Sequence, residues 1–100
     1  MKKYEVFYLD EVKVDLSSAR QWYAEQQEGL DERFVLAVKE AVSNIIKMPS
    51  AYVPRYKNVR IAHTKIFSYN IHFYIDDGKK QIIITGIVHN KRNYAVSLDR

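Results

Sequence analysis

Two alternating apolar runs joined by a short polar turn fill the last third of the chain and constrain its fold more than any other feature. From Ile66 the chain reads IFSYNIHFYIDDGKKQIIITGIVHNKRNY, with Asp77-Gly78 between the two runs. This dipeptide favours a two-residue type I′ turn, because both central positions of that turn need positive φ. The resulting register pairs Phe73 with Ile82 and Ile71 with Ile84. The sequence therefore predicts an antiparallel hairpin with one wholly apolar face, which another element must cover.

The opposite face of this predicted hairpin is mixed in character. Asn70, His72 and Tyr74 alternate along it, opposite Thr85, Ile83 and Gln81. Continuing the alternation puts His89 on the same face, provided that no β-bulge intervenes. We expect no helix over this face, and therefore expect any chemistry of the hairpin to be found there.

Two amphipathic helices are predicted between a first strand, 4–9, and Pro49. Asp10 is the predicted N-cap of the first helix and Gly29 ends it, while Asp31 starts the second helix and Pro49 ends it. Apolar side chains recur at helical spacing, namely Val12, Leu16, Ala19 and Tyr23 in the first helix, and Phe34, Val38, Ala41, Ile45 and Met48, widened by Val35, Val42 and Ile46, in the second. The short connection predicts an antiparallel helical hairpin that covers the apolar sheet face.

The segment from Arg55 to Phe67 is predicted as one strand, or as two short strands with a kink. Val59, Ile61 and Ile66 are expected to point inward, and Arg60 and His63 cannot share a face of an unbroken strand. The chain is thus predicted to be a single α+β domain over residues 1–100. It consists of an N-terminal strand, an antiparallel helical hairpin and a three-stranded antiparallel sheet, with the helices packed on one sheet face.

Composition limits the classes of protein that fit. One hundred residues can bury one modest core, and no apolar run approaches the about 20 residues that span a bilayer. The first residues, MKKYE, contain no apolar signal core. The chain has no cysteine, which excludes thiolate catalysis, disulfides and cysteine-bound zinc. We expect a cytoplasmic protein.

Charge is distributed unevenly along the chain. The net charge is +4, and after Pro54 only three acids, Asp76, Asp77 and Asp99, offset nine basic residues. Such asymmetry suits contact with a polyanion or an acidic protein partner, and an ordinary solvated basic surface explains it equally well.

The order and spacing of these segments resemble the RelE/ParE superfamily of toxins from bacterial type II toxin–antitoxin modules. The resemblance covers essentially the whole chain. Residues 67–74, FSYNIHFY, look like the family's Phe-Pro-Tyr-x-Ile-x-Tyr segment, and residues 82–92, IIITGIVHNKR, are similar to its apolar strand leading to His-x-x-Arg. Two departures are Ser68, where proline is common, and Asn93-Tyr94, where Asp-Pro often follows the arginine.

This resemblance implies a growth-inhibiting toxin that a cognate antitoxin neutralises. ParE-like members poison DNA gyrase, whereas RelE-like members cut messenger RNA in the ribosomal decoding site. Because both use one scaffold, the fold cannot decide between these targets. The segment 67–74, FSYNIHFY, and the His-x-x-Arg ending look more like ParE-like sequences, so we expect gyrase poisoning. The alternatives are the ribosome-dependent nuclease and an inactive member that only binds its antitoxin.

The nuclease alternative has definite chemical requirements. Cleavage by the substrate's 2′-hydroxyl needs a base, cations beside the phosphate and an acid at the leaving oxygen, and it needs no metal or other cofactor. Arg60 and Arg92 could hold the phosphate and His89 could transfer protons, with His72 and Tyr94 as further candidates. His89 is equally suited to hydrogen-bond the backbone, and His72 could be a half-exposed cross-strand residue without a role.

For a protein that acts by binding, the candidate surfaces are the helical hairpin and the basic C-terminal segment. Trp22 lies just off the apolar stripe of the first helix, so it is either exposed for the antitoxin or packed against the second helix. Together with Arg92 and Tyr94, it is the predicted partner-binding set.

Overall fold

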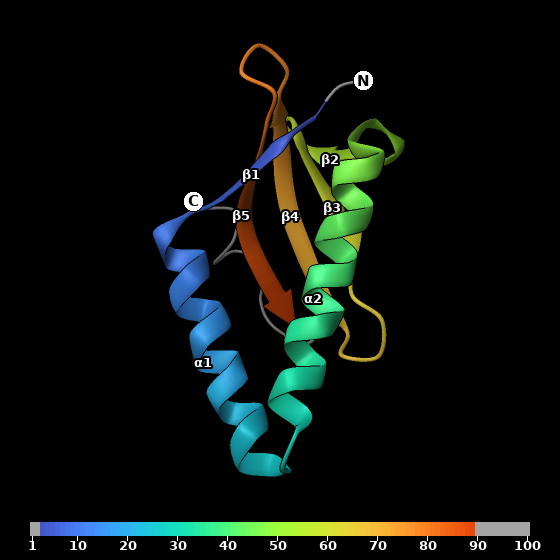
Figure 1. Cartoon of the computed structure of the whole chain (residues 1–100). Coiled ribbons are helices and arrows are strands. Elements are labelled where there is room, and N and C mark those ends of the chain that lie inside the picture. The colour runs from blue at the N-terminus through green and yellow to red at the C-terminus, as the bar shows by residue number, and fades with distance from the viewer. Residues whose placement is uncertain (1–2, 90–100) are drawn as a thin grey trace.

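A five-stranded mixed sheet and two helices make up the part of the chain that the computed structural model describes, residues 3–89 (Figure 1). In chain order the elements are β1 (Glu5–Tyr8), α1 (Asp10–Gln26), α2 (Leu30–Lys47), the 3-10 turn η1 (Pro49–Ala51), β2 (Pro54–Tyr56), β3 (Val59–His63), β4 (Tyr69–Asp76) and β5 (Gln81–His89). Both helices lie on one face of the sheet, as predicted. Neither of these helices is long and apolar enough to cross a membrane.

The strand order is β1-β5-β4-β3-β2, which confirms the α+β class but not the predicted three-stranded sheet. The first strand joins the sheet by pairing parallel to β5, with Val6 opposite Ile82. Of the two alternatives predicted for the segment after η1, the structure has the two short strands, and these pair antiparallel. Lys57, with φ of 49°, lies between them. The sequence did not show the parallel pairing because it joins the two strands that lie farthest apart in the chain.

The helical hairpin buries its apolar stripe against the sheet. Phe34 and Ile45 of α2 and Val12 of α1 have no exposed surface, and each fully buried side chain of this size contributes about 1.5–3 kcal/mol. Met48 departs from the predicted stripe, since it follows the last helical residue and is 65% exposed. The stripe therefore ends at Ile45 and Ile46, one turn earlier than expected.

The ends of the helices differ slightly from the predicted ones. Asp10 is the first residue of α1 and Leu9 occupies the N-cap position, without a side-chain cap. The connection to α2 turns at Gly29, which has φ of +83°. Glycine adopts this left-handed conformation without the steric cost that a side chain would add.

The hairpin of β4 and β5 has a register that the sequence did not predict. Four residues, 77–80, form its loop, and Asp76 is opposite Gln81. The side chain of Asp76 accepts a hydrogen bond from the backbone N–H of Lys79 at 3.1 Å. Positive φ occurs at Lys80 instead of at Asp77 and Gly78, so the predicted type I′ turn is wrong. The shift is by two residues, which leaves Phe73 and Ile84 on the helix-covered face as predicted.

A β-bulge then changes the faces of the last part of β5. Phe73 pairs with Ile84, but the preceding residue, His72, pairs with Gly86. Thr85 is therefore the extra residue, and every side chain beyond it is moved to the opposite face from the predicted one. Tyr69 consequently pairs with His89 on the helix side of the sheet.

No helix of residues 3–89 covers the second face of the sheet, as expected, yet this face is not open to solvent. His72 and Asn70 are each 1% exposed, and Ile83 and Val88 on the same face are buried. His72 is therefore not the half-exposed cross-strand residue that was one of the two alternatives for it. On β3, Ala62 and Arg60 pair with residues of the helix-covered face, so Ile61 points away from the helices, contrary to prediction.

Candidate functional site

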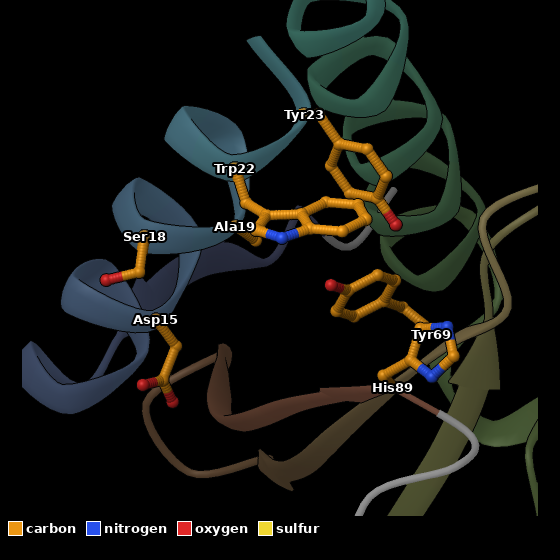
Figure 2. A pocket seen from close by; sticks show the side chains of 7 residues that line it. All are labelled: Asp15, Ser18, Ala19, Trp22, Tyr23, Tyr69 and His89. Carbon is orange, nitrogen blue, oxygen red and sulfur yellow. The ribbon is translucent and has the colours of Figure 1, made fainter. Parts of the chain in front are cut away.

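A pocket of about 460 Å³ lies between α1 and the ends of β4 and β5 (Figure 2). It is larger than a single side chain and falls within the range of ordinary small-ligand sites, roughly 300–1,000 Å³. Five lining residues come from one side of α1, and the other two are a cross-strand pair. The lining residues are Asp15, Ser18, Ala19, Trp22, Tyr23, Tyr69 and His89.

The aromatic wall of the pocket is anchored in the core. Tyr23 stacks against Phe34 with ring centroids 5.0 Å apart and meets Phe67 edge-on at 5.1 Å. Trp22, the next residue along α1, packs its ring edge-on against Tyr23 at 5.0 Å. Because neighbouring helical residues are about 100° apart around the axis, Tyr23 packs against the core while Trp22 remains 55% exposed. Of the two positions considered for Trp22, the structure has the exposed one.

The strand side of the pocket depends on the β-bulge. Tyr69 and His89 are cross-strand partners, and their rings meet almost perpendicularly with centroids 5.1 Å apart. Without Thr85 as an extra residue, His89 would point to the second face of the sheet. Gly86, the residue after the bulge, is the signal that could have revealed it, since glycine inside a strand often marks such an irregularity.

Arg60 does not belong to this pocket. Its guanidinium donates hydrogen bonds to the backbone carbonyls of Tyr52 and Ser50, in and beside η1. In the sheet register, Arg60 lies two strands and four residues away from His89, which is about 16 Å at about 4.8 Å per strand and 3.3 Å per residue. Arg60 therefore connects β3 to η1 and the residue that follows it. The structure does not bring Arg60 and His89 together.

His72 is located on the second sheet face, away from the pocket. Its Nδ1 is 2.8 Å from the hydroxyl of Tyr56, and burial lowers the pKa of the imidazole below its ordinary value. Beside it, the ring of His63 is hydrogen-bonded to the side chain of Asn70. These pairs form a polar row across β2, β3 and β4. Arg92 and Tyr94, the other predicted site residues, lie outside the described residues.

A second, more apolar groove of about 270 Å³ runs between the two helices. Phe34, Val35 and Val38 from α2 and Leu16 from α1 line it, and Arg20 and Lys39 contribute positive charge. Tyr8 also borders the groove, and burial raises the pKa of its phenol. This groove was not predicted, because it depends on the spacing between the two helices and not on the pattern of apolar residues within either helix.

Comparison with known proteins agrees with this architecture. The fold is similar to that in the crystal structure of the toxin–antitoxin complex RelBE2 from Mycobacterium tuberculosis, with 20% identity, a TM-score of 0.65 and coverage of 88% of this chain and 99% of that one. It is also similar to that of the chromosomal ParDE toxin–antitoxin system from P. aeruginosa, with 16% identity, a TM-score of 0.71 and coverage of 89% and 98%. No curated protein matches the chain in sequence.

The match of the sequence to a family model identifies the family. The model of the family described as "ParE toxin of type II toxin-antitoxin system, parDE" matches residues 6–94, which include both helices, all five strands but one residue of β1, and the His-x-x-Arg ending. The chain belongs to the ParE toxin family of type II toxin–antitoxin systems.

Proposed function

We propose that this protein inhibits growth by binding and poisoning DNA gyrase in the cytoplasm, and that a cognate antitoxin neutralises it. The observation that carries the proposal is the dispersal of the candidate nuclease residues within residues 3–89. His89 lines the pocket on the helix side, His72 is buried on the other face, and Arg60 is bound to the backbone near η1. A protein that acts by binding has no need of these groups in one place.

Cleavage of RNA has a stricter geometrical demand. The base must come within about 3 Å of the 2′-hydroxyl while cations contact the neighbouring phosphate. At about 16 Å from His89, and with its guanidinium turned to the carbonyl of Tyr52, Arg60 does not contact a phosphate that His89 serves. Burial lowers the pKa of His72 and so disfavours its protonated form, and with 1% exposure the ring is poorly accessible to a substrate in solvent.

The antitoxin is the second part of the proposal. Both similar structures are of toxin–antitoxin systems, RelBE2 and ParDE. The surface of this chain offers two places for a polypeptide partner on its helical side, the aromatic pocket and the interhelical groove. Exposed Trp22 lies at the first of them, where an aromatic side chain can contribute strongly to a protein interface.

Two assays with purified components test the target. In the first, supercoiled DNA is incubated with gyrase and the protein, and the expected result is trapped, cleaved DNA. In the second, messenger RNA is incubated with the protein, with and without ribosomes, and the RNA should stay intact. Ribosome-dependent cleavage of the RNA would contradict the gyrase proposal and support the nuclease. Expression that causes no growth arrest, with neither activity in vitro, would identify an inactive antitoxin-binding member.

A further inference from the structure

Basic side chains gather at the end of the sheet that carries the β2–β3 turn and the β4–β5 loop (Figure 1). The turn contains Lys57, and the loop contains Lys79 and Lys80. Lys3 precedes β1, and the parallel pairing of β1 with β5 brings the start of β1 to the same end. With Arg55 of β2, these four lysines form a group of cations that we call the basic end.

The cations of the basic end are accessible. Lys57, Lys79 and Arg55 are exposed, and Lys80 is partly exposed. Within residues 3–89, every ion pair between side chains joins other residues. The basic end is therefore able to accept a negatively charged ligand without first breaking an ion pair of this part of the chain.

Acids at the same end reduce its charge but do not cancel it. Glu5, Asp76 and Asp77 lie here, against the five cations. Asp76 already accepts a hydrogen bond from the backbone N–H of Lys79. Asp77 accepts one from the hydroxyl of Tyr4 at 3.0 Å. The basic end therefore keeps a net positive charge.

Two lysines of the basic end have a backbone conformation that lysine seldom adopts. The angle φ is 49° at Lys57 and 54° at Lys80, in the left-handed region where a Cβ meets steric resistance and glycine or asparagine is preferred. Asn58 and Gly78 lie in the same two turns and yet do not have positive φ. Strained backbone of this kind is concentrated at functional sites. The strain therefore indicates that the lysine side chains at these positions have a role outside the fold.

The composition of the two tips, residues 57–58 and 77–80, favours a nucleic acid over a protein as the ligand. Lysine is depleted in protein–protein interfaces, whereas lysine and arginine supply the contacts to the phosphates of nucleic acids. Neither tip contains an aromatic residue on which the bases of a single strand could stack. A double-stranded ligand, which presents its phosphates while its base faces are covered, fits the tips better.

The spacing of the tips also suits a duplex. In the sheet register, the β2–β3 turn lies two strands to the side of the β4–β5 loop, and it starts two residues lower along the strands. The separation is about 12 Å at about 4.8 Å per strand and 3.3 Å per residue. This is close to the width of the major groove of DNA, about 12 Å, so the two tips can contact phosphates on both sides of one groove.

We infer that the basic end binds the phosphate backbone of double-stranded DNA, and that this DNA is the duplex on which gyrase acts. Lys57 contacts the backbone on one side of a groove, and Lys79 and Lys80 contact it on the other. The identity of the duplex as the substrate of gyrase rests on the proposed function, whereas the preference for phosphates rests on the basic end alone. This difference allows the two to be tested separately.

Direct binding of DNA is measured without gyrase. A short fluorescein-labelled duplex is titrated with the full-length protein, and its fluorescence anisotropy is followed between about 50 and 200 mM salt. Each phosphate contact adds about −0.9 to the slope of log K against log salt concentration, so four or five contacts predict a slope of about −4. The affinity should not depend on the base sequence. Absence of binding, or binding that salt does not weaken, would overturn the inference.

Matched substitutions locate the surface. Lys57→Gln/Lys80→Gln removes one cation from each tip. We expect it to weaken binding at low salt by at least about tenfold and to bring the slope about 2 closer to zero. Lys13→Gln/Arg33→Gln removes the same charge from exposed positions on the two helices and should leave the slope nearly unchanged. Equal effects of the two double substitutions would show only a general attraction to a basic protein, and would overturn the assignment of the site.

Glycine at the strained positions separates a role in binding from a role in the fold. Lys57→Gly and Lys80→Gly each remove both the charge and the strain. We expect each to raise the urea midpoint by about 0.5 M while weakening the binding of DNA. A glycine variant that is more stable and still binds DNA as tightly as the original protein would overturn the inference, since its lysine would then have neither role.

Competition experiments identify the class of ligand. Polyglutamate carries its negative charges on a polypeptide, and single-stranded RNA carries phosphates at a lower charge density than a duplex. We expect unlabelled duplex to displace the labelled one at concentrations at least about tenfold lower than either competitor. Equal displacement by polyglutamate would identify an acidic protein as the ligand, and stronger displacement by RNA would identify RNA. Either result would overturn the assignment to DNA.

A final comparison separates the basic end from the proposed function. The gyrase assay is repeated with Lys57→Gln/Lys80→Gln, and we expect the same amount of trapped, cleaved DNA to need about tenfold more protein. Unchanged trapping, with direct DNA binding lost, would overturn the assignment to the DNA that gyrase holds. If the original protein binds the duplex through these lysines but traps no DNA with gyrase, the proposed target is refuted while the phosphate site is confirmed.

Discussion

Phe34 connects the stability of the core to the shape of the pocket, and its replacement by alanine should affect both. The side chain has no exposed surface, and its ring lies 5.0 Å from Tyr23, 5.1 Å from Tyr69 and 5.5 Å from Phe67. Replacing a buried phenylalanine by alanine costs about 3–5 kcal/mol, and each aromatic contact adds about 0.5–1.5 kcal/mol beyond the buried area. We therefore expect the upper part of that range, about 4–5 kcal/mol, for Phe34→Ala.

Urea unfolding followed by circular dichroism measures this loss. With an m-value of about 2 kcal/mol/M for a domain of this size, the midpoint should fall by about 2 M. A total stability of about 5–15 kcal/mol means that the variant could be largely unfolded, so Phe34→Leu, with an expected cost of about 1–2 kcal/mol, gives a measurable intermediate. Leu36→Ala, on the same helix but 64% exposed, is the control and should change the stability by less than about 0.5 kcal/mol.

The result that would refute this reasoning is a loss below about 1 kcal/mol for Phe34→Ala. It would mean that the three remaining rings collapse into the space left by Phe34, and that Tyr23 and Tyr69 are not held in place by Phe34. A change in Trp22 emission in the folded Phe34→Leu variant would show that the disturbance extends to the pocket.

Three further predictions concern stability. Burial lowers the folded-state pKa of His72, so the unfolded chain, with a histidine pKa of about 6.5, binds the proton first as the pH falls. The contribution of neutral His72 to the stability of the folded state is therefore complete above about pH 6.5 and is lost on acidification. Urea midpoints should therefore fall more between neutral pH and about pH 5 in the original protein than in His72→Gln, and parallel curves would contradict this. Gly29→Ala should cost about 1–2 kcal/mol because of its φ of +83°, without any clash, since nothing lies within 4 Å of an added Cβ; a neutral effect in urea unfolding would refute the strain. Arg60→Gln should lower the unfolding free energy by about 1.5–3 kcal/mol through the lost bond to the carbonyl of Tyr52, whereas Arg55→Gln, at an exposed position, should change it by less than about 0.5 kcal/mol, and equal effects would contradict a specific role for Arg60.

The sequence predicted what depends on local periodicity. Phe34, Val38, Ala41 and Ile45 are buried along one side of α2 as the 3.6-residue repeat requires, and the helical hairpin covers the expected face of the sheet. These predictions succeed because an amphipathic helix has only one side on which it can bury its apolar residues. The prediction for Met48 is wrong because α2 ends before this residue, where Pro49 disfavours helical geometry.

The register of the strands and the pairing of distant strands were harder to predict from the sequence. A four-residue loop replaced the expected two-residue turn because the side chain of Asp76 bonds the backbone of the loop at Lys79. The bulge at Thr85 then reversed the face of His89. Because of this one extra residue, His89 does not lie on the sheet face of His72. It lines the same pocket as Trp22, a residue predicted for a different role. A pattern of alternating residues cannot show where the alternation is interrupted, except through the weak signal of Gly86.

The parallel pairing of β1 with β5 has a consequence for how the protein is made. Glu5 lies opposite Gln81, so the contact closes a separation of 76 residues. Contacts between distant segments are slow to form, because the entropy of closing the chain must be overcome first. During synthesis from the N-terminus, β1 has no strand to pair with until β5 has been made, whereas β2, β3 and β4 can already pair with one another. A ribosome that stops early releases a chain without its central strand pair, and an incomplete copy of this toxin is therefore expected to be harmless.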